Sequence, residues 1–237
     1  MEETDMMHQT DADAMNTEEK AVMDKLNQIV EWWLKPCEQR GIDISDELNS
    51  IPDWRLLEMI NQVQHNLIRV NAVKDQWANR TSQRKFDDIF TDNTYPFLPK
   101  LPKEYGKMVP ASYFKSKKLA DLLKDAYHNS LIYAAAVSML AKEKYSNPAA
   151  EKVFHYMKFE IKQLICELYS FCEDSKVVVT SNVSASVVPQ NLQGSSLDLT
   201  QQLIREHIIF KEYINFLQYL EQLLMYIKNH LFPAKRF

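Results

Sequence analysis

Hydrophobic residues recur at intervals of three, four or seven over four long stretches of this chain, and that spacing predicts amphipathic α-helices. Each stretch opens near serine, asparagine or proline, which are residues that suit the first turn of a helix. The expected helices cover about 52–85, 112–146, 148–172 and 196–232. Because 147–148 is a very short break, the second and third of these should be antiparallel neighbours.

A shorter helix is expected before these four, starting at Asn16, where Asn16 and Glu19 stand at the spacing of a capping box. Its apolar positions run to Trp33, and Pro36 with Gly41 should end it. Residues 1–15 are acidic and carry little apolar content, so they should form a disordered tail.

Two connections interrupt the helical spacing. Residues 86–111 contain four prolines together with aromatic and leucine side chains, which predicts an extended strap against the helices rather than a polar linker. Residues 173–196 mix valine pairs with serine and asparagine. A short β-pairing is one interpretation of that second segment, and a mobile loop is favoured over it.

The expected fold is therefore all-α. Residues 16–237 should form a single bundle of four long helices plus the shorter N-terminal helix, mostly antiparallel, with long Pro-rich and Ser/Val-rich crossover loops. The three glycines agree with this interpretation, because Gly41, Gly106 and Gly194 all fall in expected connections.

Composition limits the class of binding partner and the cellular compartment that can be expected. A net charge of −4 disfavours a nucleic-acid binder, and the 237-residue chain contains no apolar run of the length that spans a bilayer. Three cysteines without a C-x-x-C spacing are typical of reduced thiols. With no leader sequence evident, a cytoplasmic or nuclear location is expected.

Candidate chemistry is sparse. The glycines do not form a nucleotide-binding fingerprint, and the pairs Asp125/His128 and Glu151/His155 lack the further ligands that a metal site needs. Cys37 is the one candidate for a reactive thiol, whereas Cys166 and Cys172 are interpreted as core residues. We therefore expect no catalytic residue, cofactor or metal.

Aromatic and basic side chains supply the candidate interaction sites. Trp32 and Trp33 are adjacent, so Trp32 should lie at the edge of the stripe that Trp33 continues, in contact with another element or with a different chain. The candidate partner-binding residues are Trp32, Tyr95, Phe97, Tyr213, Tyr219 and Tyr226. The candidate basic patch, for which a solvated loop is the favoured interpretation, comprises Lys100, Lys103, Lys107, Lys115, Lys117 and Lys118.

Three functions agree with these features. The leading hypothesis is a non-enzymatic interaction module, an adaptor or subunit of an intracellular complex with one or more protein partners. The first alternative is a leaderless cytokine-like helical ligand, because long helices with long crossovers match that class. The second is a bundle enzyme or carrier with an interhelical pocket. The glycosylation motifs at Asn79 and Asn182 are no more frequent than chance predicts.

Overall fold

The structure is a computed structural model that describes residues 31–34, 37, 53–81, 85–89, 94–143, 148–193 and 197–231. The chain divides into two compact units, Met1–Trp32 and Trp33–Phe237, and the helical bundle belongs to the second. The expected acidic tail at 1–15, and almost all of the helix expected from Asn16, lie outside the described residues. At the end of that expected helix a 3-10 helix, η1, covers Trp32–Leu34.

The all-α bundle predicted from the spacing is confirmed. Four long helices occupy the described residues of the second unit: α2 (Asp53–Thr81), α4 (Leu119–Lys142), α5 (Pro148–Asp174) and α6 (Leu199–Leu231). Their bounds lie within a few residues of the expected ones, except at the start of the second.

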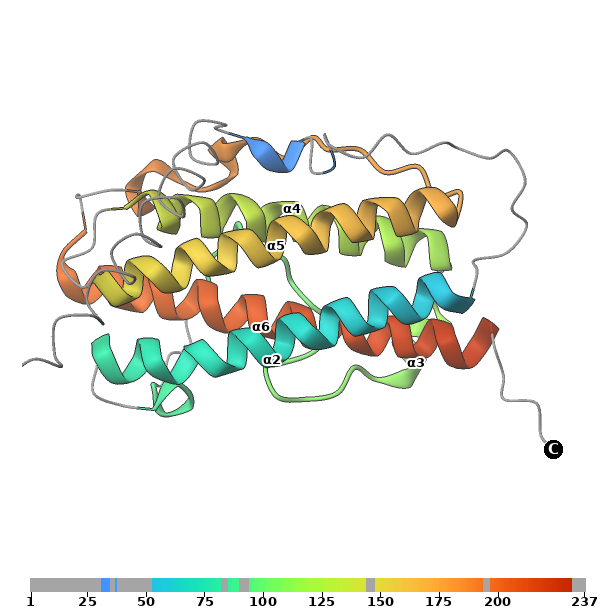
Figure 1. Cartoon of the computed structure of the whole chain (residues 1–237), viewed down its shortest axis with the longest axis horizontal. Coiled ribbons are helices and arrows are strands. Elements are labelled where there is room, and N and C mark those ends of the chain that lie inside the picture. The colour runs from blue at the N-terminus through green and yellow to red at the C-terminus, as the bar shows by residue number, and fades with distance from the viewer. Residues whose placement is uncertain are drawn as a thin grey trace, which may run out of the picture. The chain divides into compact units, whose positions relative to one another are not determined.

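The chain directions give the bundle its topology. In Figure 1, α2 and α4 run one way and α5 and α6 run the opposite way. The packed pairs are α2 with α5 and α6, and α4 with α5 and α6. Every packed pair is therefore antiparallel, while the two parallel pairs lie diagonally across the bundle. The long connections 82–118 and 175–198 each join two parallel helices, and only the short 143–147 segment joins antiparallel neighbours.

Local sequence fixes two helix ends. Asp198 accepts a hydrogen bond from the Gln201 backbone N–H at 2.8 Å, and the Gln201 side chain accepts from the Asp198 N–H at 3.2 Å, which is a capping box at the start of α6. At the end of α5, Lys176 has φ of 55° and Val177 donates to the Cys172 carbonyl. This Schellman motif places lysine where glycine is usual.

The helix expected from Ser112 is broken in two. A short helix, α3, covers Ala111–Lys115, and α4 begins only at Leu119 after an extended Lys118. The Ser116 hydroxyl donates to the Tyr113 carbonyl at 2.8 Å, so the side chain competes with helical backbone bonding at this point.

The described residues of the expected strap, 86–89 and 94–111, pack against the helices. Leu98 and Val109 are buried, and the Lys103 ammonium group donates to two amide oxygens on α6, those of Asn215 and Gln218. The Val109 N–H donates to Gln222, one helical turn further along α6. The strap therefore lies along α6 and closes one side of the bundle.

The second connection contains no strand among its described residues. It forms two 3-10 turns, η3 (Ala185–Val187) and η4 (Gln190–Leu192), and η3 packs against α4. Val177, Val183 and Val188 are buried. These three valines anchor the segment to the bundle, an arrangement that the expectation of a mobile loop did not include.

Candidate partner-binding surface

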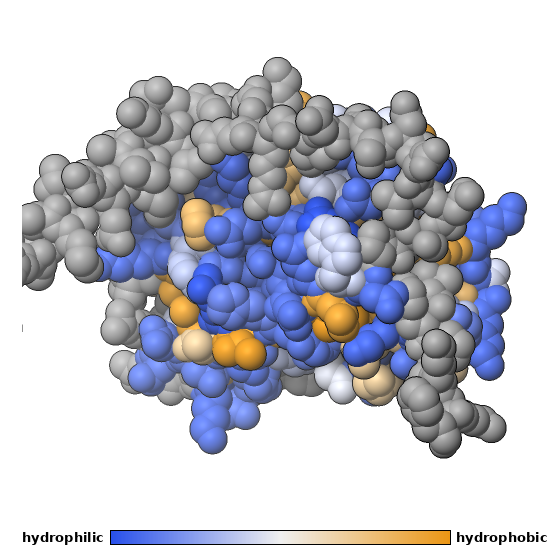
Figure 2. All heavy atoms as spheres, turned by 45° about the vertical axis from the view of Figure 1, so that its right-hand side comes forward, coloured by the Kyte–Doolittle hydropathy of each residue, from blue (hydrophilic) through white to orange (hydrophobic). Residues whose placement is uncertain are grey.

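The outward face of α2 carries three large apolar side chains. Trp54 is 64% exposed, Leu57 is 42% exposed and Ile68 is 68% exposed. They project from the side of α2 opposite its buried stripe, because 3.6 residues complete one turn. Figure 2 shows that hydrophobic groups on the surface occur as separate islands within a polar surround. We call this surface, residues 54–68 on the outward side of α2, the α2 face.

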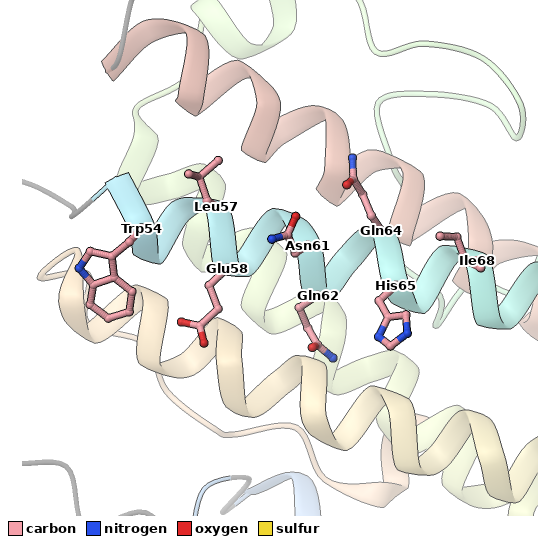
Figure 3. A pocket seen from close by; sticks show the side chains of 8 residues that line it. All are labelled: Trp54, Leu57, Glu58, Asn61, Gln62, Gln64, His65 and Ile68. Carbon is pink, nitrogen blue, oxygen red and sulfur yellow. The ribbon is translucent and has the colours of Figure 1, made fainter.

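A shallow depression lies on the α2 face. In Figure 3, Leu57 and Gln64 point toward α6, whereas Trp54 and His65 point toward α5. The described lining residues are Trp54, Leu57, Glu58, Asn61, Gln62, Gln64, His65 and Ile68. The centre of the face is thus polar, with three amide side chains together with Glu58 and His65 between apolar ends.

Polar bonds to both neighbouring helices hold the α2 face in place. On the α5 side, Arg55 donates to Asp174 at 2.8 Å and to Glu167 at 3.2 Å, and Arg69 pairs with Glu160 at 2.5 Å. On the other side, the Gln64 amide donates to Glu221 of α6 at 2.9 Å. These contacts fix the α2 backbone, so its exposed side chains project from a rigid support.

One cation, Arg55, contacts residues at the rim of the α2 face. Arg55 lies 5.9 Å from the ring centroid of Trp54, within cation–π range. The same guanidinium donates to Glu58 at 2.6 Å, one helical turn further on. Burial lowers the pKa of Arg55, but the hydrogen bonds to Glu58 and Asp174 and the negative charge of Glu167 together outweigh burial, so the pKa is raised.

The sequence contained a signal for the α2 face that the pattern argument did not use. The apolar stripe at helical spacing along α2 is buried, and its members Val63 and Val70 are fully buried. Trp54, Leu57 and Ile68 are large apolar residues that fall off that stripe. Apolar residues on the polar side of an otherwise amphipathic helix are the signal that would have identified the site.

Three of the candidate partner-binding aromatics are buried. Tyr213 and Tyr219 are 0% and 1% exposed, so the wide apolar arc of α6 is covered within the bundle by α2, α4 and the strap. Trp32 is 3% exposed, so it does not face outward as a contact for a different chain would require. Trp32 sits in a 3-10 helix, so the argument from one α-helical stripe does not apply to it.

The other three candidate aromatics are half-buried. Tyr95 and Phe97 stack on each other with ring centroids 5.7 Å apart, and burial raises the pKa of Tyr95. Tyr226 stacks on Phe114 of α3 at 5.1 Å. These rings pack within the chain, and none lies in the described lining of the α2 face.

The candidate basic patch is not continuous. Lys103 is buried against α6, where burial lowers its pKa, so it is a strap anchor rather than a surface charge. Lys107 pairs with Glu104 at 2.5 Å. The remaining exposed members are Lys100, Lys115, Lys117 and Lys118. Lys103 was expected in a solvated loop. It is buried instead because amide oxygens of α6 accept hydrogen bonds from its ammonium group.

The expectation of reduced cysteines is corrected by the structure. Cys37 and Cys166 form a disulfide with a Cα–Cα distance of 5.2 Å, within the range of ordinary disulfides. Neither residue is therefore a free thiol. Cys172 is free and fully buried, as expected of a core residue, and burial raises its pKa to about 12.

Buried charged residues gather on α6 at Arg205, Glu206 and His207. Arg205 pairs with Glu143 beyond α4, Glu206 accepts a hydrogen bond from Trp77 of α2, and the His207 ring lies 3.2 Å from the Phe86 carbonyl in η2 (Phe86–Asp88). Each group therefore ties α6 to a different segment. In the described part of the chain, no group of three or more histidine, cysteine or acidic residues is arranged to hold a metal.

Comparisons with known proteins identify no family for this chain. No family model, curated protein or solved structure matches this chain. Among the described residues, none of the helices combines the length and apolar character needed to cross a membrane.

Proposed function

We propose that this chain is a helical protein ligand of the cytokine-like class, which binds a protein receptor through the α2 face. The observation that carries the proposal is the direction of the four helices. Two parallel pairs joined by two long crossovers are the topology of growth-hormone and cytokine bundles. The chain needs no catalytic site for such a role.

The disulfide between Cys37 and Cys166 supports the proposed ligand role independently of the helix topology. Disulfides persist in oxidising environments and are rare in the cytosol and nucleus. Cys37 and Cys166 join the N-terminal part of the second unit to α5 across 129 residues. This favours a ligand that meets its partner outside the cytosol over the intracellular adaptor expected from composition.

The α2 face supports the choice of surface. A fold does not imply a function, so the binding role must rest on a site. Tryptophan is strongly enriched among interface hot spots, and Trp54 is largely exposed on a helix held by bonds to α5 and α6. Trp54, Leu57 and Ile68 are the residues that we assign to receptor contact.

Binding to intact cells tests the proposal. The oxidised chain, labelled at one site, should bind in a saturable manner to cells from the organism that encodes it. Ile68→Asp should weaken that binding at least about tenfold, because it places a charge in an apolar contact. Leu199→Asp is the matched control, since Leu199 is 64% exposed on α6 and lies outside the α2 face.

Two outcomes would overturn the proposal. Equal affinities of the two variants would exclude the α2 face. The intracellular adaptor would be favoured instead if intact cells showed no saturable binding and a stoichiometric complex were recovered from inside those cells. Circular dichroism and thermal unfolding of both variants establish that the fold is unchanged.

A further inference from the structure

The segment Asn182-Val183-Ser184 lies in the second crossover and matches the acceptor motif for N-linked glycosylation. Sequence alone gave this match no weight. The structure adds the orientation of each side chain: Val183 is 5% exposed, whereas Asn182 and Ser184 on either side are exposed. An extended segment alternates in this way, with one residue facing the bundle and its neighbours facing solvent.

Bonds on both sides of Asn182 fix this orientation. The hydroxyl groups of Ser181 and Tyr127 of α4 lie 2.7 Å apart, and the Val183 carbonyl accepts a hydrogen bond from the Trp33 indole at 2.8 Å. The segment is therefore attached to the bundle immediately before and after Asn182. The Asn182 side chain is directed outward by the register of its neighbours.

We propose that Asn182 is an N-glycosylation site. The inference rests on the proposed function, because the modification occurs only in the secretory pathway. The donor is a lipid-pyrophosphate-linked oligosaccharide. The Asn182 amide nitrogen forms a bond to the anomeric carbon of the sugar, the bond from that carbon to the pyrophosphate oxygen breaks, the lipid pyrophosphate leaves, and the amide loses one proton. No oxidation or reduction takes place.

The bundle accommodates a glycan at this position. The transfer precedes complete folding, so the folded structure decides only whether the sugar has room. Asn182 is exposed, and its crossover packs on α4 through η3 and Tyr127. In Figure 1 this crossover runs along the upper edge of the bundle, while α2 lies at the lower edge. A glycan on Asn182 would therefore leave the α2 face open to a receptor.

The test is the mass of the chain isolated from its natural source. Treatment with N-glycosidase in heavy-oxygen water should remove a glycan and leave a labelled aspartate at position 182. In cells that secrete the chain behind an added signal peptide, Asn182→Gln and Ser184→Ala should both lose the glycan mass. Asn191→Gln, an exposed asparagine in η4 without the motif, should retain it.

An unmodified Asn182 in the natural protein overturns the inference. Retention of the whole glycan mass in Asn182→Gln also overturns it, since the sugar would then be on another asparagine such as Asn79, which is exposed and carries the same motif. These readouts are independent of receptor binding. A glycosylated chain that does not bind cells contradicts the proposed ligand role alone, and a cell-binding chain without the glycan contradicts only the assignment of Asn182.

Discussion

Arg205 on α6 makes a two-point ion pair with Glu143, just beyond the end of α4, with N–O distances of 2.8 and 2.5 Å. The Arg205 side chain is completely buried and also donates to the Leu192 carbonyl at 2.7 Å. The pair therefore joins the end of α4, the second crossover and the start of α6.

Removing one partner should be more harmful than removing both. Glu143→Ala removes the two-point partner of a buried guanidinium and leaves it with the more distant carboxylate of Glu206, at 3.9 Å, so the variant should lower the free energy of unfolding by about 3 kcal/mol. The double variant Glu143→Leu/Arg205→Met should recover most of that loss. Urea denaturation measures both, and a double variant as unstable as the single one would contradict this account.

Glu206 should make the fold less stable as the pH rises toward neutrality. Burial raises its pKa to about 7, although the Trp77 hydrogen bond and Arg205 oppose the increase. A raised carboxyl pKa means that the folded state binds more protons than the unfolded state between about pH 4.5 and 7. The stability contributed by Glu206 is therefore present at acidic pH and lost through this window.

Glu206→Gln tests this contribution. The variant should gain about 2–3 kcal/mol relative to the wild type between pH 5 and pH 8. Burial lowers the pKa of the neighbouring His207, which gives the opposite dependence on pH, but His207 is present in both proteins and largely cancels in the comparison. A difference between the two proteins that does not vary with pH would refute the assignment.

Trp33→Phe should lower the free energy of unfolding of the bundle because one hydrogen-bond donor is lost. The substitution keeps an aromatic ring but removes the indole N–H that donates to the Val183 carbonyl. An unpaired buried carbonyl costs about 1–3 kcal/mol. Trp54→Phe, the same change at an exposed position, should alter thermal stability by less than about 0.5 kcal/mol. Equal effects at the two positions would argue against the buried bond.

Loss of the disulfide should destabilise the chain by about 2–5 kcal/mol, because it closes a long loop. The double variant Cys37→Ser/Cys166→Ser should match the wild type treated with reductant. Thiol titration after unfolding should find only Cys172 without reductant and all three cysteines with it. Reductant that leaves the wild-type stability unchanged would contradict a stabilising disulfide.

The candidate site was less predictable than the fold because burial depends on neighbours. Tyr213 and Trp54 are both aromatic residues on predicted helices, yet one is in the core and the other is exposed. Lys103 shows the same limit: its charge predicted a solvated position, whereas amides on α6, more than a hundred residues later, give it a buried one. The composition of a short segment does not indicate which distant residues it will contact in the folded chain.

The sequence by itself determined the all-α class, the strap and the approximate extents of the four long helices, except for the start of α4, because helical spacing and proline content act over a few residues. The tertiary structure decided which helices run parallel across the two long crossovers, the disulfide between Cys37 and Cys166, and the packing that leaves Trp54, Leu57 and Ile68 of the α2 face exposed. These features join residues far apart in the chain. Loop-closure entropy changes slowly with loop length, so the sequence separation of two residues indicates little about whether they meet.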